Sequence, residues 1–300
     1  MRNRKNRIKL TTGEVVFNIF NYTIFALFAL ICIFPFYYVI INSLSDNANS
    51  GNALFWPVGF HTDNWEQVFT VKGLVRSFGV SVLRVVVGTV LSLLCTSFMG
   101  YALSRRELFA RRVWYRMITF TMYFGAGMIA TYLVYVNYGL RNTFWVYILP
   151  GLISPYNLML FKTYVESIPE SLEESAQIDG AGYLTRFIMI VLPLCKPIIG
   201  TLCIFTAVGH WNAFMDCIMY ITDEKLFTAM FKLRQVLSEA QQIAQQIING
   251  GAAADVDFSQ MTATGLRFTI AAVVTLPVLC IYPFFQKYFT GGIMIGAVKG

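Results

Sequence analysis

Long apolar runs separated by short polar or charged segments dominate this chain of 300 residues. A bilayer core about 30 Å thick is crossed by roughly 20 apolar residues of helix. Six runs approach or exceed that length: 15–41, 77–103, 113–136, 142–162, 197–220 and 265–287. Pro35, Pro155 and Pro277 fall inside or near the ends of three runs, where neighbouring helices can satisfy the freed carbonyl groups. The pattern predicts an all-α, polytopic membrane protein with about six transmembrane helices.

The composition supports a membrane protein, because 56% of the residues are hydrophobic and only 13% are charged. Soluble domains carry about a quarter charged residues, so too few charges are present here to coat a soluble globule. The six cysteines lie mostly inside apolar runs and form no C-x-x-C pair, which favours buried small side chains over disulfides or a metal site. The first apolar run exceeds a signal-peptide core and is interpreted as an uncleaved membrane helix.

The basic residues indicate the orientation in the membrane. The net charge of +7 is concentrated in clusters at 2–9 and 105–116, which flank apolar runs as the positive-inside rule expects. This distribution favours topology over a nucleic-acid patch. With the segment 42–76 outside, six crossings place both termini and the loop 163–196 in the cytoplasm. The segment 221–264 then becomes a long external loop.

The organisation that follows has three parts: 1–76 with the first helix and an external loop, a transmembrane core over 77–287, and a cytoplasmic tail over 288–300. In the external loop, residues 233–248 have apolar positions three and four apart, which predicts an amphipathic helix that ends at Gly250 and Gly251. Such a helix either meets a partner outside or packs on the membrane surface.

The cytoplasmic loop 163–196 has its own helical pattern. Acidic residues follow Pro169, where the helix dipole favours negative charge, and predict a short helix over 170–178. Asp179 and Gly180 form a turn signal, a second short helix is expected over 183–191, and Pro193 marks the return to the bilayer.

Two motifs resemble those of ABC-importer permeases. Glu174, Ser175 and Ala176, with Gly180 after them and Leu192-Pro193 further on, resemble the EAA coupling motif, Ser175 replacing the usual alanine. The segment 209–214 resembles the G-x-W-N-x-F pattern of the carbohydrate branch, specifically the subunit similar to the second maltose permease, and 296–300 resembles that branch's C-terminal end.

This resemblance implies a type I ABC importer permease in the cell membrane that forms half of a translocation path for a carbohydrate. Within the carbohydrate branch, the chain most resembles permeases for complex oligosaccharides or polysaccharide fragments. Its partners would be a second, different permease, two cytoplasmic ATPase subunits and an extracellular solute-binding protein. The chain has no G-x-x-x-x-G-K-[ST] phosphate loop, so ATP and Mg²⁺ would be used by the ATPase subunits, and no cofactor or enzymatic activity is expected in this chain.

The resemblance assigns ATPase coupling to a set of residues in the cytoplasmic loop. These are Glu173, Glu174, Ser175, Ala176, Asp179, Gly180, Ala181, Leu192 and Pro193. The alternative for the glutamates is a solvated acidic face.

Five residues inside the predicted spans are candidates for the translocation path: Arg84, His210, Trp211, Asn212 and Asp216. Trp211 and Asn212 alternatively pack helices together. Arg84 and Asp216 are placed near the outer helix ends, where snorkelling to the interface is the default, and a pairing between them is the alternative hypothesis. His210 has no evident carboxylate partner that would make it a proton relay.

Two other classes of membrane protein are alternatives to an ABC permease. An ion-coupled transporter working alone would need buried acidic residues as ion sites, and the spans contain almost none. A membrane-embedded glycosyltransferase would need clustered acids or histidines at the interface, and only the acids of 166–179 qualify.

Overall fold

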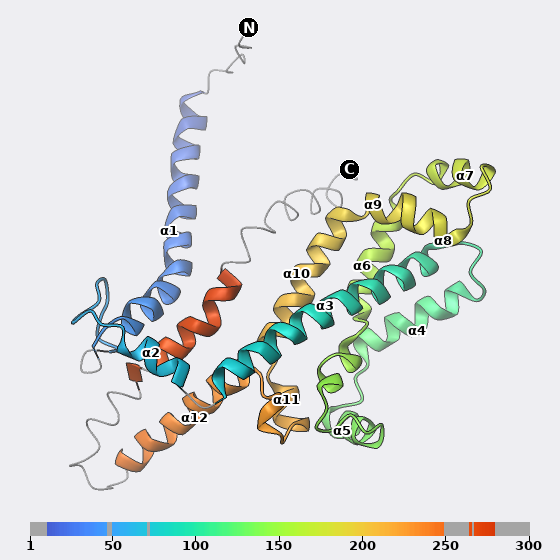
Figure 1. Cartoon of the computed structure of the whole chain (residues 1–300). Coiled ribbons are helices and arrows are strands. Elements are labelled where there is room, and N and C mark those ends of the chain that lie inside the picture. The colour runs from blue at the N-terminus through green and yellow to red at the C-terminus, as the bar shows by residue number, and fades with distance from the viewer. Residues whose placement is uncertain (1–10, 47–49, 71–72, 249–263, 266, 280–300) are drawn as a thin grey trace. The chain divides into compact units, whose positions relative to one another are not determined.

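The computed structural model describes residues 11–46, 50–70, 73–248, 264–265 and 267–279, and over these residues it is built from helices and loops without a strand (Figure 1). Gly250 and Gly251, the tail 288–300 and the last part of the sixth predicted span lie outside the described residues. The chain divides into two units, 1–68 with 242–272 and 69–241 with 273–300.

The first unit is dominated by α1 (Thr12–Ser43), a helix that begins in a capping box, with Glu14 and the N-cap Thr11 bonded to each other. Pro35 lies inside it. Most of its large apolar side chains are exposed, which suits a helix surrounded by lipid. At its C-terminal end the buried Asn42 bonds the backbone of Gly51 and Ala53, and this holds the following loop against the helix. The helix α2 (Asp63–Thr70) follows.

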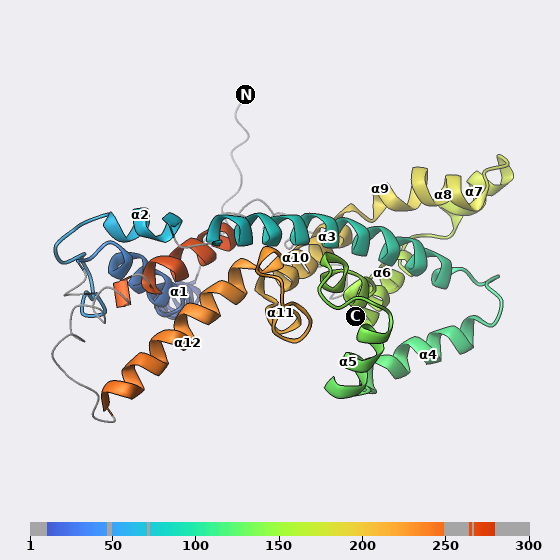
Figure 2. The same cartoon turned by 60° about the horizontal axis from the view of Figure 1, so that its bottom comes forward.

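The long helix α3 (Leu74–Ser104) runs through the second unit (Figures 1 and 2), and α6 (Pro155–Glu166) and α10 (Lys196–Asn212) pack against it. The buried face of α3 carries small or hydroxyl side chains at helical spacing: Ser77, Ser81, Gly88, Ser92, Thr96, Gly100 and Ser104. Small residues let membrane helices approach closely. A Cβ atom on Gly100 would lie 2.6 Å from the Phe161 ring, so the α3–α6 contact depends on that glycine.

Two predicted spans are bent in the structure. The span expected over 113–136 is divided into α4 (Arg111–Tyr123) and α5 (Met128–Asn137), which meet at 117°. The reason is local, because Gly127 before α5 has φ +81° and cannot continue a right-handed helix. The turns η1 (Phe144–Tyr147) and η2 (Leu149–Gly151) precede α6 with a 48° bend.

The remaining helices are α7 (Ser171–Ile178), α8 (Tyr183–Arg186), the π-helical η3 (Phe187–Val191), α9 (Leu192–Leu194), α11 (Met215–Tyr220), η4 (Glu224–Leu226), α12 (Ala229–Ile248) and Arg267–Leu279. The segment Tyr183–Leu194 meets α10 at 79°. Within the described residues, two helices are long and apolar enough to cross a membrane, or up to five if each bent pair is one span. The amphipathic helix predicted over 233–248 is confirmed and begins four residues earlier.

Candidate functional site

The cytoplasmic loop forms the short helix, turn and second helix that the sequence predicted. The helix α7 ends in a Schellman motif, because the backbone N–H of Gly180 donates to Gln177 at 3.0 Å and that of Ala181 to Ala176 at 2.9 Å. Gly180 takes the left-handed conformation at φ +81° that this motif requires. The turn is therefore set by the residue type at position 180.

The surface of α7 presents much of the predicted motif to its surroundings. Glu174, Ser175 and Asp179 are exposed together with Gly180, and no atom lies within 4 Å of the position that a Cβ of Gly180 would take. Ala176 and Ala181 are half-buried. Pro193 is exposed and Leu192 half-buried in α9. The helix α7 lies at one end of the second unit (Figure 1).

Glu173 differs from its neighbours because it points inward and is only 6% exposed. Its carboxylate accepts hydrogen bonds from Arg105 Nη1 at 2.5 Å and from Tyr101 Oη at 3.2 Å. The Arg105 guanidinium also lies 4.6 Å from the centre of the Tyr101 ring. The interpretation of Glu173 as part of a solvated acidic face is therefore wrong, since this contact ties α7 to the C-terminal end of α3.

Two further ion pairs lie nearby, one between the loop after α3 and the start of α7 and one between α4 and α6, and together the three form what we call the arginine–glutamate ladder. It consists of Arg105–Glu173, Arg106–Glu170 and Arg111–Glu166. The Arg106–Glu170 pair, at 2.6 Å, is largely exposed and contributes little to stability. From the sequence alone, these arginines indicated only the orientation in the membrane. The signal that could have found the pairs is that three arginines of one loop are matched by three glutamates, at 166, 170 and 173, spaced four and three residues apart.

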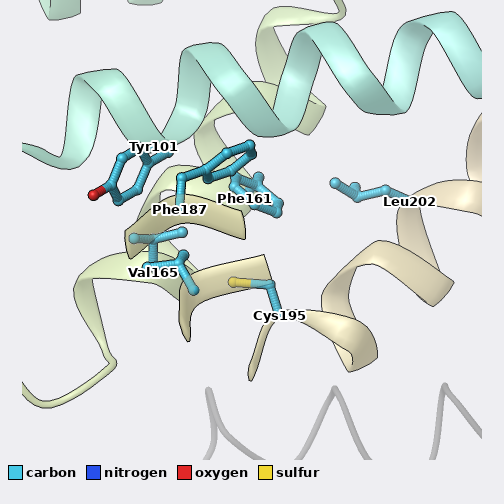
Figure 3. Packing of buried hydrophobic residues seen from close by; sticks show 7 residues of the cluster. Tyr101, Phe161, Val165, Phe187, Cys195 and Leu202 are labelled. Carbon is cyan, nitrogen blue, oxygen red and sulfur yellow. The ribbon is translucent and has the colours of Figure 1, made fainter. Parts of the chain in front are cut away.

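A hydrophobic cluster lies beneath the cytoplasmic loop (Figure 3). It is made by Tyr101, Phe161, Val165, Phe187, Val191, Cys195 and Leu202, from α3, α6, η3 and α10 with the residue that precedes α10. Burial, with the Glu173 carboxylate adding to it, raises the pKa of the Cys195 thiol to about 12. The thiol therefore stays protonated and packs as a small apolar group.

A second polar group joins α3 to the break between α10 and α11. Arg84 is 2% exposed and forms a salt bridge with Asp216, with Nη1 to Oδ1 at 3.2 Å. It also donates to the carbonyl of Ala213 at 3.0 Å and lies 4.6 Å from the Tyr147 ring centre. The hypothesis that Arg84 and Asp216 pair is confirmed. The default of snorkelling is wrong for Arg84, because α10 ends at Asn212 and the chain turns Asp216 toward α3.

The other candidate path residues lie close by but not in one group. The Nε2 atom of His210 would be 2.5 Å from a Cβ on Gly88, so this side chain packs directly on α3. Trp211 is 7% exposed and donates from Nε1 to the Val274 carbonyl at 3.0 Å. Asn212 is exposed. Trp211 thus packs between elements of the second unit, as the helix-packing alternative expected.

Comparison with known proteins identifies relatives of the whole chain. The family model for the binding-protein-dependent transport system inner membrane component matches residues 88–295. The polygalacturonan/rhamnogalacturonan transport system permease protein YtcP of Bacillus subtilis is 37% identical over 95% of this chain and 99% of that protein. Protein LplC of Bacillus subtilis is also 37% identical, over 97% of each chain.

A solved structure has the same fold. It is described as a bacterial ABC transporter involved in the import of the acidic polysaccharide alginate. Its matching chain is 26% identical, with a TM-score of 0.80 over 94% of this chain and 99% of that one.

Proposed function

Because the chain belongs to the family of binding-protein-dependent transport system inner membrane components, we propose that it is the permease subunit that couples an ATP-driven carbohydrate importer to its ATPase through α7. It forms half of the translocation path, and a second, different permease forms the other half. The chain itself makes and breaks no bond.

The observation that carries the coupling proposal is the shape of α7. A short exposed helix with a fixed αL turn at Gly180 presents Glu174, Ser175 and Asp179 outward. This surface is short and exposed, which suits insertion into a groove on a soluble subunit. We assign the groove to the neighbouring ATPase subunit, where ATP and Mg²⁺ are bound.

Movement of a docked α7 needs a rigid connection to the membrane helices. The Glu173–Arg105 contact supplies one, because it is nearly buried and joins α7 to α3 by a charge-assisted hydrogen bond. The cluster beneath adds packing between η3, α6 and α3. A displacement of α7 therefore moves α3 rather than only the loop.

The orientation proposed is the one that the basic residues indicate. Both termini and the 163–196 loop face the cytoplasm, and the loop 221–264 faces the solute-binding protein outside. The helix α12 lies in that loop and, by its amphipathic pattern, is a candidate for contact with the binding protein.

The substrate class proposed is an oligosaccharide or polysaccharide fragment. Support comes from the names of relatives, which refer to polygalacturonan, rhamnogalacturonan and alginate. Binding of candidate sugars to the solute-binding protein that works with this permease tests the class. If that protein binds only amino acids or peptides, the carbohydrate assignment fails while the coupling proposal stands.

Substitution of Gly180 tests the coupling role. Gly180→Ala forces a side chain into the αL conformation, at a cost of roughly 1–2 kcal/mol, and we expect it to disturb the turn and abolish sugar uptake while the subunit is still produced and inserted. Gly182→Ala is the matched control, because Gly182 has φ −69° and open space around it.

The readouts are sugar uptake and ATP hydrolysis by the reconstituted complex. Wild-type uptake in Gly180→Ala, or equal loss in Gly182→Ala, would contradict the role assigned to the turn. Uptake that follows a proton gradient and needs no ATP would instead support an ion-coupled transporter.

A further inference from the structure

A small cavity that shares Arg111 with the arginine–glutamate ladder is lined almost entirely by cations. It has a volume of about 210 Å³ and is lined by Arg111, Arg112, Tyr115, Arg116 and Lys162. The first four residues come from the N-terminal half of α4, and Lys162 comes from α6, which packs against α4. Figures 1 and 2 both show α4 at the edge of the second unit.

The positive charge of the cavity is not balanced by the protein. Glu166 forms ion pairs with both Lys162, at 2.8 Å, and Arg111. Within the part of the chain that the structure describes, Arg112 and Arg116 have no carboxylate partner. Four cations thus face a single carboxylate, and the surplus calls for an anion from outside the chain.

The cavity beside the arginine–glutamate ladder differs from this one in its charge balance. A larger cavity there, of about 300 Å³, is lined by several arginines but also by Glu166, Glu170, Glu173 and Glu174. Arg105, Arg106 and Arg111 there are each paired with a glutamate, whereas Arg112 and Arg116 of α4 are not. The unbalanced cations are therefore a particular feature of α4 rather than of the whole basic loop.

The adjoining face of α4 is apolar and exposed. Val113, Trp114, Met117 and Phe120 are each at least 50% exposed and lie beside the row formed by Arg112 and Arg116. Tyr115 borders the cavity, with the Lys162 Nζ atom 4.7 Å from its ring centre. Aromatic and basic residues at a helix end are typical of the headgroup level of a bilayer.

We propose that this cavity binds the phosphate of an anionic phospholipid, such as phosphatidylglycerol or cardiolipin. Arg112 and Arg116 contact the phosphate oxygens together with Lys162, whose side chain is only 12% exposed and is fixed by Glu166. The acyl chains lie along Trp114, Met117 and Phe120. Basic pockets between membrane helices have the chemistry that such headgroups require. The lipid would hold the start of α4 in place beside α6.

The test uses the purified transporter complex in neutral detergent, titrated with phosphatidylglycerol, and its thermal unfolding is followed. We expect phosphatidylglycerol to raise the melting temperature of wild type. In the Arg112→Gln/Arg116→Gln variant we expect a roughly thirty-fold weaker apparent affinity for the lipid. Arg112→Lys/Arg116→Lys keeps the charge and should retain most of the response, which separates lipid binding from general damage to the fold.

Two controls distinguish the source of the phosphate. Arg141→Gln/Lys196→Gln removes the same charge from exposed positions elsewhere and should respond as wild type does. Inorganic phosphate and phosphatidylcholine should give no shift. An equal shift with inorganic phosphate, or an unchanged phosphatidylglycerol response in Arg112→Gln/Arg116→Gln, would overturn the proposal.

Discussion

The buried pair of Arg84 and Asp216 gives the sharpest prediction about stability. Removing only one partner should destabilise the second unit strongly, because the other charge stays inside the protein without compensation. In Arg84→Ala the Asp216 carboxylate, whose side chain is 23% exposed, loses a salt bridge with two hydrogen bonds. The Ala213 carbonyl also loses its donor.

The expected magnitude follows from these contacts. Breaking a buried pair from one side costs about 3–5 kcal/mol, and the partial exposure of Asp216 places Arg84→Ala near 3 kcal/mol. Arg84→Lys keeps the charge but cannot reach both carboxylate oxygens and Ala213 together, so we expect a loss of about 1–2 kcal/mol. The double variant Arg84→Met/Asp216→Leu removes both charges and should be close to wild type.

Thermal unfolding of the purified transporter, measured for wild type and all three variants in the same detergent, checks this order. We expect Arg84→Ala to unfold at the lowest temperature and the double variant to unfold above it. If Arg84→Ala unfolds at the same temperature as wild type, or if the double variant is as unstable as Arg84→Ala, the pair does not hold α11 against α3.

Two further predictions concern contacts of α3. Gly88→Ala would place a Cβ 2.5 Å from His210 and should lower the stability by about 1–3 kcal/mol. Gly79→Ala, with open space around it, should be neutral or slightly stabilising in the same thermal-unfolding assay. Equal unfolding temperatures for the two variants would argue against close α3–α10 packing. Arg105→Glu places two carboxylates together and should lower sugar uptake per ATP hydrolysed, and adding Glu173→Arg should restore part of it by reforming the pair. No recovery in the double variant would show that the contact does not link α7 to α3.

Much of the fold could be predicted from the sequence, because bilayer-length apolar runs and the charges between them are strong signals. The turn of the cytoplasmic loop was also predictable, since Asp179 and Gly180 follow a short acidic helix, and the Schellman motif there uses local hydrogen bonds only. The family membership confirms the resemblance that those residues carried.

Other features depend on contacts between distant segments and gave no local signal. The inward direction of Glu173 is decided by Arg105, 68 residues earlier, and nothing near Glu173 in the sequence distinguishes it from Glu174. The sharp bend before α5 was missed because the apolar run continues through Gly127 while its backbone does not. The burial of Arg84 likewise required the position of Asp216, which only the break after Asn212 determines.

The helix α7 is, in our proposal, the surface that the ATPase subunit binds. The most direct measurement places a photo-cross-linking amino acid at Asp179, which is exposed in the structure, in the assembled transporter in native membranes. We expect an adduct with the ATPase subunit, and none when the probe stands at Asp223 in the loop proposed to face outside. Repeated absence of an ATPase adduct from Asp179, in a complex that still transports sugar, would contradict the account.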